Sequence, residues 1–291
     1  MLNYAKLLEG KNCIVTAGAH GLGYAVADLF ASHGANVAIC GLRESGAKSA
    51  EKLRKLHGTD CIFFQCDMGN MDSVAEFADK VLAHYGTVDV LVNNVGVNRK
   101  DRIVDLSLED MEAVHNTNFK SAVVLMKKCL PKMMEQHSGS IVNVSSMNSL
   151  APSPTTGSYA SSKGAMNSLS KVMAVEGGKY GVRCNVICPG WIATNYMQQE
   201  VEEAGGDERV LENYNGSSPM IAPARASDIA NHILFLASDM SSYVTGTVLR
   251  ADGAAVIQAQ ECQFPEPDDA EEMRLAYYRD ILDELKNKMG E

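Results

Sequence analysis

Short apolar runs alternate along this chain with longer amphipathic segments, and this alternation constrains the fold more than any other feature of the sequence. It is typical of units in which a strand, a helix and a second, parallel strand follow one another, so that helices cover both faces of the sheet. The sequence therefore predicts an α/β fold with a doubly wound parallel sheet of about seven strands. The expected strands are 13–16, 36–40, 61–65, 88–92, 140–144, 183–187 and 247–250.

The length of 291 residues suits one large domain with a tail, because α/β domains of this size are commonly single. We expect the domain over residues 1–254 and the tail over residues 255–291. In the tail, a polar stretch with Pro265 and Pro267 precedes acidic residues that favour the start of a helix. The apolar stripe of that helix needs a surface to cover it, on its own subunit or on a neighbouring one. The stripe consists of Met273, Tyr277, Tyr278, Ile281, Leu282, Leu285 and Met289.

Composition and charge exclude several classes of protein. With 46% hydrophobic and 21% charged residues, the chain can bury a sizeable core. The net charge is -10 and the pI is near 5.2, so the chain has no excess of basic residues to bind nucleic acid or anionic lipid. We therefore expect neither nucleic acid nor a membrane as a partner. No run of about eighteen apolar residues is present to cross a membrane, so we expect a cytoplasmic protein.

The cysteines fall mostly within or beside the expected strands, and we interpret them as reduced thiols of the core. The sequence contains neither a Cys-x-x-Cys pair nor a His-Glu-x-x-His segment, so it predicts no metal site. The eight cysteines are Cys13, Cys40, Cys61, Cys66, Cys129, Cys184, Cys188 and Cys262.

A glycine-rich turn follows the first expected strand. Thr16 ends the strand, residues 17–23 read Ala-Gly-Ala-His-Gly-Leu-Gly, and an apolar helix comes next. Such a turn lets the backbone approach a pyrophosphate, while the helix N-terminus offers unpaired N–H groups and the positive end of its dipole. The turn therefore predicts a phosphate site. Right-handed crossovers bring the loops after the fourth, fifth and sixth strands to the same edge of the sheet.

Tyr159 and Lys163 stand one helical turn apart. Tyr159 comes thirteen residues after Ser146, which lies at the end of an apolar run. A free phenol has a pKa of about 10 and is a poor acid or base at neutral pH, but a nearby ammonium group favours its charged form. Side chains four residues apart share one face of a helix, so Lys163 can lie beside Tyr159. The pattern predicts a proton-transfer site.

Together these residues resemble the short-chain dehydrogenase/reductase family, which carries a Thr-Gly-x-x-x-Gly-x-Gly turn and an active site of Ser with Tyr-x-x-x-Lys. The resemblance runs from about Leu8 to about Ala254. It implies a Rossmann-like fold and a homodimer or homotetramer. Further family motifs follow in the expected order, namely Asp67-Met68, Asn93-Asn94-Val95-Gly96, Asn118, Ser145-Ser146, Pro189-Gly190 with Thr194, Thr245-Gly246 and Asp252-Gly253.

The resemblance implies an NAD(P)-dependent oxidoreductase that interconverts a secondary alcohol and a ketone. Tyr159 would be the general acid/base, and Lys163 would lower the phenol pKa and bind the nicotinamide ribose. Ser146 would hold the substrate oxygen, and Asn118 would bind a water that leads protons to solvent. Ser145 competes with Ser146 for its role, and the family spacing of thirteen residues before the tyrosine favours Ser146.

The same resemblance implies a set of residues around the dinucleotide. Asn93 has an alternative interpretation, since the family uses this turn to brace the sheet. The implied residues are Thr16, Gly18, His20, Gly21, Leu22, Gly23, Arg43, Asp67, Met68, Asn93, Asn94, Gly96, Tyr159, Lys163, Pro189, Gly190, Ile192 and Thr194.

Two departures from the family pattern concern the cofactor. Ala17 replaces the first motif glycine, and its methyl group is expected to exclude a positive φ and to add bulk near the adenosine ribose. After the second strand, Arg43 and His20 could meet a 2′-phosphate, yet Leu42 occupies the usual basic position and Glu44 would repel phosphate. Both NAD(H) and NADP(H) stay open, and the sequence favours NAD(H), because a poorly paired phosphate costs more than hydrated ribose hydroxyls.

Residues 191–223 correspond to the family's substrate loop. Their apolar side chains favour a bulky apolar substrate such as a hydroxysteroid, or they cap the fold instead. Sugars or polyols and 3-oxoacyl thioesters stay open as substrates, and so does a nucleotide-binding scaffold without turnover. A tail that crosses to a neighbour would border that subunit's substrate cleft. The apolar residues are Trp191, Ile192, Tyr196, Met197, Tyr214, Met220 and Ile221.

Overall fold

The computed structural model describes residues 3–193, 197, 201–207, 209–211, 219–220, 223–258 and 269–289. Its strands form one parallel sheet in the order β3-β2-β1-β4-β5-β6-β7, which confirms the doubly wound α/β prediction. The strands are β1 (Asn12–Val15), β2 (Asn36–Gly41), β3 (Cys61–Gln65), β4 (Val90–Asn93), β5 (Gly139–Val144), β6 (Val182–Pro189) and β7 (Val248–Ala251).

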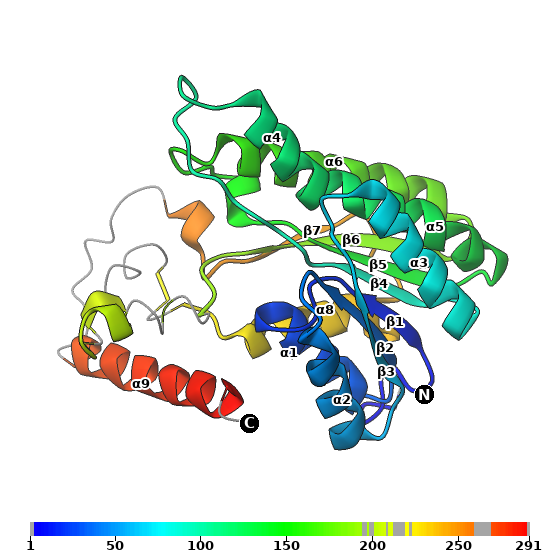
Figure 1. Ribbon diagram of the computed structural model, residues 1–291, viewed down its shortest axis with the longest axis horizontal. Coiled ribbons are helices and arrows are strands. Elements are labelled where there is room, and N and C mark those ends of the chain that lie inside the picture. Colours follow the sequence, from blue (N-terminus) through cyan, green and yellow to red (C-terminus); the bar gives the residue numbers. More distant parts are fainter. Residues whose placement is uncertain are drawn as a thin grey trace.

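Helices cover both faces of the sheet (Figure 1). One face carries α1 (Gly21–Ser32), α2 (Gly46–His57) and α8 (Ala226–Ala237). The other carries α3 (Met71–Tyr85), α4 (Leu108–His115), α5 (Ser121–Glu135) and α6 (Gly157–Gly178).

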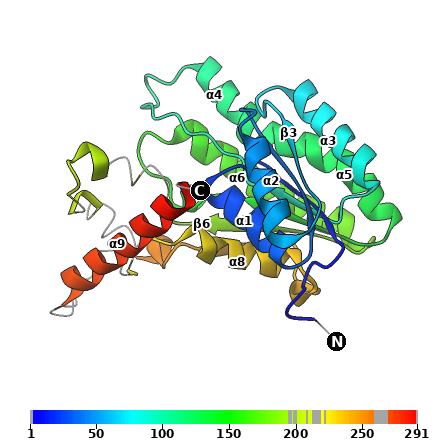
Figure 2. The same ribbon diagram turned by 60° about the horizontal axis from the view of Figure 1, so that its bottom comes forward.

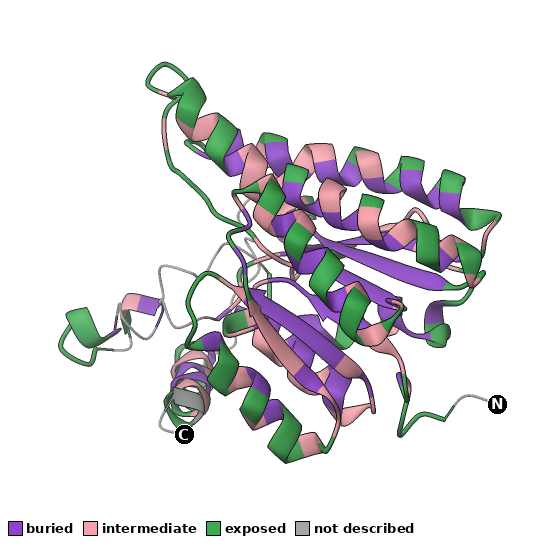
Figure 3. Cartoon of the chain, turned by 45° about the vertical axis from the view of Figure 1, so that its right-hand side comes forward, coloured by how far each residue is buried: buried purple, intermediate pink, exposed green. Residues whose placement is uncertain are grey.

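Both faces of the sheet are buried, which explains why the strand sequences are continuously apolar. Successive side chains of a strand point to opposite faces. Cys13 and Val15 of β1 accordingly belong to the core with α1 and α8, whereas Ile14 belongs to the core with α3 and α5. Figure 3 shows the strands as the most completely buried part of the chain.

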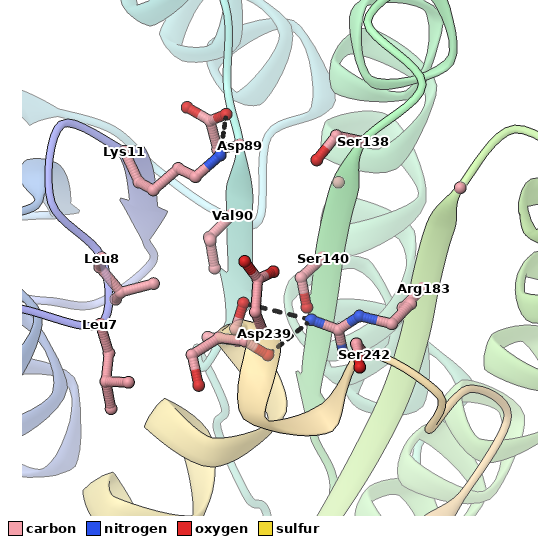
Figure 4. A pocket seen from close by; sticks show the side chains of 14 residues that line it. Leu7, Leu8, Lys11, Asp89, Val90, Ser138, Ser140, Arg183, Asp239 and Ser242 are labelled. Carbon is pink, nitrogen blue, oxygen red and sulfur yellow. Dashed lines mark hydrogen bonds and ion pairs between the residues drawn. The ribbon is translucent and has the colours of Figure 1, made fainter. Parts of the chain in front are cut away.

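A small pocket of about 170 Å³ lies at the amino edge of the sheet, opposite the predicted motifs (Figure 4). Lys11 Nζ pairs with Asp89 there at 3.4 Å. The Arg183 guanidinium donates to the carbonyl oxygen of Leu236 and the hydroxyl of Ser241, each at 2.7 Å. Because a guanidinium stabilises carbonyl groups at a helix C-terminus, Arg183 fastens the end of α8 to β6.

The tail contains the predicted helix, α9 (Ala270–Met289), with Glu271 and Glu272 in its first turn. It lies at the side of the molecule away from α3 and α5 (Figures 1 and 2). A third hydrophobic cluster forms around it and covers Tyr278, Ile281 and Leu282 of the predicted stripe, whereas Met273 is 48% exposed. We call this cluster the satellite core; its buried members are Ala193, Met197, Val201, Leu211, Tyr278, Ile281 and Leu282.

The predicted spacer of the tail, with Pro265 and Pro267, lies outside the described residues. Among the helices that are described, none combines the length and the apolar character needed to cross a bilayer.

Candidate active site

The predicted motifs gather at the carboxyl edge of the sheet. The glycine turn follows β1, the turn with Gly96 follows β4, Ser146 follows β5 and Gly190 follows β6. The neighbouring strands β1 and β4 lead to helices on opposite faces of the sheet (Figure 1). Ligands of doubly wound proteins bind in the crevice at such a switch point.

Tyr159 and Lys163 lie in the first two turns of α6, on one side of the helix. The Lys163 side chain is 2% exposed, and its Nζ donates to the carbonyl oxygens of Val144 at 2.8 Å and Val95 at 3.4 Å. The same Nζ lies 5.9 Å from the centroid of the Tyr159 ring. A Cβ atom at Gly96 would lie 3.3 Å from this nitrogen, so Gly96 leaves room for the buried amine.

Burial controls the protonation of both groups. Loss of water raises the pKa of Tyr159 above its ordinary value, and a hydrogen bond with Ser146 acts in the opposite direction. Loss of water also lowers the pKa of Lys163 to about 8. The expected net lowering of the Tyr159 pKa is therefore wrong, because desolvation of the phenolate outweighs the contacts that stabilise it. At neutral pH the phenol is a proton donor.

The two neighbouring serines have different surroundings. Ser146 hydrogen-bonds with Tyr159, and its Oγ accepts from the Asn148 amide at 3.1 Å at the start of the 3-10 helix η2 (Met147–Ser149). Ser145 Oγ instead donates to the carbonyl oxygen of Lys163 at 3.1 Å. Ser146 is thus the serine that faces the phenol, whereas Ser145 fastens β5 to α6.

Asn118 lies in a short π-helix, η1 (Asn116–Lys120), between α4 and α5. Its Oδ1 accepts from the Val97 amide at 2.8 Å, and its Nδ2 donates to the Val97 carbonyl oxygen at 2.9 Å and to Ser162 Oγ at 3.1 Å. These three bonds tie the loop after β4 to α6 close to Tyr159. A π-helical turn inside an α-helix is often found at a functional site.

Thr16 and the residues after β4 form one bonded unit. Thr16 Oγ1 accepts from the amides of Asn94 at 2.8 Å and Val95 at 3.0 Å, while Asn94 Nδ2 donates to the Thr16 carbonyl at 3.0 Å. Asn93 is buried, and its Nδ2 donates to Asn143 Oδ1 on β5 at 2.7 Å. This placement favours the bracing role of Asn93 over the cofactor contact that the sequence also allowed.

The glycine turn is packed too closely for larger residues. A Cβ atom at Gly18 would lie 2.5 Å from Ile39, and one at Gly23 would lie 2.1 Å from the Ala17 carbonyl oxygen. Gly21 has a φ of +56°, and Ala17 itself has a φ of +51°. The expectation that Ala17 excludes a positive φ is therefore wrong, and the surrounding packing holds an alanine in a conformation that favours glycine.

The N-terminus of α1 points its backbone amides at this edge without a side-chain cap. His20 occupies the N-cap position with no side-chain hydrogen bond, and the first turn contains no acidic residue. Leu22 packs against the core, while His20 and Gly21 are exposed. These uncapped amides suit an anionic group.

The residues expected around the adenosine divide into two groups. Leu42 is 66% exposed, and Arg43 and Asp67 are exposed as well. Asp67 Oδ1 accepts from the Gly69 amide at 2.8 Å, which shapes the turn after β3. The Met68 side chain, by contrast, is buried in the core with α3, so only its backbone faces the predicted site.

The loop after β6 starts in close contact with the end of β7. Pro189 pairs with Ala251, and a Cβ atom at Gly190 would lie 2.9 Å from the Cα of Asp252. Ile192 forms a bridge with Ala224. Thr194, Tyr196, Tyr214 and Ile221 lie outside the described residues.

A pocket of about 470 Å³ lies beside this loop, and Tyr277 of α9 contributes to its wall. Met197 is absent from the wall, because it is buried in the satellite core. Neither Tyr277 nor Arg250 was among the predicted catalytic or cofactor-binding residues. The apolar stripe could have indicated Tyr277, whereas no motif marks Arg250. The lining residues are Trp191, Met220, Pro223, Ala224, Asp228, Ile229, His232, Arg250, Ala251, Asp252, Gly253, Ala254 and Tyr277.

A family model described as enoyl-(acyl carrier protein) reductase matches residues 16–254. The 3-oxoacyl-[acyl-carrier-protein] reductase FabG of Chlamydia muridarum is 37% identical over 248 residues, which cover 85% of this chain and 98% of the relative. The L-rhamnose 1-dehydrogenase (NAD(P)(+)) of a Sphingomonas species is 33% identical, over 88% of this chain and all of the relative. This chain belongs to the short-chain dehydrogenase/reductase family, as its motifs indicated, and is an oxidoreductase.

Solved structures agree with this assignment. L-sorbose reductase from Gluconobacter frateurii, complexed with NADPH and L-sorbose, superposes with a TM-score of 0.82 at 25% identity. The match covers 87% of this chain and 98% of that chain.

Proposed function

We propose that this chain is a ketone reductase, working reversibly as a secondary-alcohol dehydrogenase, with 3-oxoacyl thioesters as its substrate class. The single observation that carries the reaction type is the buried trio where α6 meets the end of β5, in which Ser146 acts on the Tyr159 phenol and Lys163 Nζ lies 5.9 Å from the Tyr159 ring centroid. The substrate class rests on the family description and on the FabG relative. No relative named above carries a steroid in its name, and the hydroxysteroid prediction has no support.

The glycine turn fits a nicotinamide dinucleotide. Gly18 and Gly23 let the turn pack closely on its own backbone and on Ile39, a Cβ atom at Gly21 would meet no protein atom within 4 Å, and the α1 amides beside it have no side-chain cap. Asn94, held by the buried Thr16, and the exposed Gly96 continue this surface toward Lys163. When bound, the reduced dinucleotide supplies the hydride that the carbonyl carbon accepts.

Tyr159 donates the proton that the ketone oxygen needs as it becomes an alkoxide. Burial keeps the phenol protonated by raising its pKa, so the acid form is present at neutral pH. Ser146 holds the same oxygen, because its hydroxyl already lies within hydrogen-bond reach of the phenol. Donors aimed at an oxygen that gains negative charge lower the barrier directly.

Lys163 stabilises the phenolate that remains after proton transfer. Its amine is fixed by the carbonyl groups of Val95 and Val144, and with a pKa of about 8 it is mostly charged at neutral pH. We assign two roles to Asn118. It holds the loop after β4 in place, and it maintains the path along which solvent returns a proton to Tyr159.

For the cofactor, we propose that NADP(H) is accepted through Arg43 and His20, and we abandon the preference for NAD(H). Both side chains are exposed beside the predicted adenosine site. Arg43→Ala should raise KM for NADPH by about tenfold while KM for NADH changes little, because only the phosphate loses a charge-assisted bond. Equal effects on both cofactors would show that Arg43 does not distinguish them.

A sugar or polyol substrate is the second candidate, since L-sorbose reductase shares this fold closely and L-rhamnose 1-dehydrogenase shares the sequence. One panel separates the candidates. Acetoacetyl-coenzyme A, L-sorbose and a 3-ketosteroid are each offered with NADPH and with NADH, and cofactor oxidation is followed by absorbance. We expect the thioester to give the highest kcat/KM. A higher value for sorbose would favour the second candidate, and dinucleotide binding without any turnover would favour a scaffold.

A further inference from the structure

Three sulfur atoms meet where β2 and β3 end. Cys40 Sγ lies 3.7 Å from Met68 Sδ, and Cys66 Sγ lies 3.6 Å from the same atom. Met68 Sδ therefore contacts both thiols, and we call these three sulfur atoms the sulfur triangle.

The topology explains how residues distant in the sequence come together. Cys40 is paired with Phe64 in the parallel ladder, so Cys66 lies two residues further along β3's direction and on the same face. The Cys66 amide donates to the Gly41 carbonyl oxygen at 3.0 Å, which fixes this register. The turn at Gly69 then directs Met68 back into the core, where all three side chains are buried.

We propose that Cys40, Cys66 and Met68 form a binding site for one soft monovalent cation, Cu(I) being the ion that fits. Thiolate and thioether sulfur atoms select Cu(I) over harder ions. With metal–sulfur bonds of about 2.3 Å, three sulfur atoms in a trigonal plane lie about 4.0 Å apart. The distances from Met68 Sδ to the two thiols are 3.7 and 3.6 Å, so each thiol needs to move away from the methionine sulfur by only a few tenths of an ångström.

The Ser73 hydroxyl donates to Cys66 Sγ at 3.6 Å, a contact that would stabilise the thiolate needed for binding. In the complete site both thiols lose their protons to solvent, the cation forms two thiolate bonds and one thioether bond, and nothing is oxidised or reduced.

The sequence predicted no metal site, because the usual metal-binding motifs place their ligands at short spacing in one segment and contain no methionine. Within the part of the chain that the structure describes, no three side chains of the His, Cys, Asp and Glu types form a metal-binding group.

The test titrates the full-length protein with Cu(I) under anaerobic conditions, in competition with a chromophoric Cu(I) chelator. We expect one tightly bound ion and the release of about two protons, seen as a buffer-dependent binding enthalpy. X-ray absorption of the unmutated protein should show three sulfur neighbours at about 2.3 Å. A first shell of nitrogen or oxygen, or of two sulfur atoms only, would overturn the proposal. Because this measurement uses the unmutated protein, misfolding of a variant cannot explain the result.

Variants assign the ligands. Cys40→Ser and Cys66→Ser should each weaken binding by at least ~100-fold, since outer-shell changes alone cost 10–100-fold. Met68→Leu keeps the side-chain volume and should remove one sulfur neighbour from the absorption spectrum. Cys129→Ser is the matched control, because Cys129 is equally buried on the same face of the sheet, and it should bind as the parent does. Unchanged affinity in both thiol variants, or an equal loss in the control, would show that the ion binds elsewhere.

Discussion

The sheet with its two main cores and the satellite core around α9 are held together by different means. In the sheet, strands are buried on both faces, and the polar groups of the candidate site are bonded to backbone atoms, as Thr16 and Lys163 show. Among the described residues, the satellite core has seven buried apolar side chains. Its polar support includes an exposed ion pair between Arg225 and Asp280 and the Tyr277 hydroxyl, which donates to the Pro223 carbonyl oxygen at 3.2 Å.

This difference separates what the chain shares with its relatives from what it adds. The family model ends at residue 254, and α9 lies beyond that residue. The match with the FabG relative spans 98% of that protein but only 85% of this chain. The proposed chemistry therefore belongs to the rigid shared part, whereas the added helix packs on residues of the loop that follows β6. We propose that α9 serves mainly to hold that loop.

The largest effect should come from the shared part. Tyr159→Phe removes the proton donor and should lower kcat by about 10²–10⁴-fold, with the dissociation constant for the dinucleotide unchanged. Steady-state kinetics and a fluorescence titration measure the two quantities. Tyr243→Phe is the control, because that ring is fully exposed and away from the carboxyl edge. Normal turnover by Tyr159→Phe would contradict the role of the phenol.

A cavity in the satellite core should act locally. Tyr278 is completely buried there. Tyr278→Ala should destabilise the docking of α9 by about 3–5 kcal/mol, the usual cost of deleting a buried aromatic ring. Hydrogen exchange should then accelerate across residues 270–289, while the main unfolding transition stays in place.

Phe77→Ala provides the comparison for that variant, since Phe77 is equally buried in the core with α3. It should lower the midpoint of the main transition. If Tyr278→Ala lowers that midpoint as much as Phe77→Ala, the satellite core is part of the same cooperative unit as the sheet.

The pH dependence of stability tests the burial of Lys163. Its pKa is about 8 in the folded chain against 10.5 ordinarily, so the unfolded chain binds more protons between these values. Stability should therefore rise with pH across this interval, by up to about 3 kcal/mol relative to Lys163→Met. Urea unfolding of the two proteins from neutral to alkaline pH measures the difference. Parallel curves would mean that the amine keeps its ordinary pKa.

The smallest effect is expected at the rim of the satellite core. Arg225 pairs with Asp280, and its guanidinium carbon lies 4.9 Å from the centroid of the Tyr277 ring. Asp280→Asn should cost no more than about 0.5–1 kcal/mol of α9 docking, because the pair is largely exposed and screened by water. Hydrogen exchange of α9 measures it, with Glu76→Gln in the exposed pair with Lys80 as the control. A cost as large as that of Tyr278→Ala would make the ion pair the principal support.

The sequence predicted the strands well because the apolar pattern that marks a strand is set by residues that are neighbours in the chain. All seven strands occur within two residues of their expected positions; the fourth, for example, was expected at 88–92 and spans Val90–Asn93. Ser146, Tyr159 and Lys163 also come together as predicted, since two lie on one helix and the third ends the neighbouring strand.

Other properties of the site depend on three-dimensional burial that spacing does not encode. The positive φ of Ala17 results from packing across the turn, and the raised pKa of Tyr159 results from loss of water. Met197 belongs to the satellite core, where it packs with residues of α9 far along the chain. A sequence pattern cannot distinguish such a residue from one that lines a substrate cleft.

Val95 has a further consequence through its backbone. Its amide donates to the Thr16 hydroxyl at 3.0 Å, and its carbonyl oxygen accepts from Lys163 at 3.4 Å. One peptide segment is thus a mechanical linkage between the turn that would hold the phosphates and the amine that would serve the phenol. A displacement of Thr16 or of Lys163 would therefore move the other through Val95. An elongated ligand that binds incorrectly at the glycine turn would disturb the position of the amine, and the reverse holds as well.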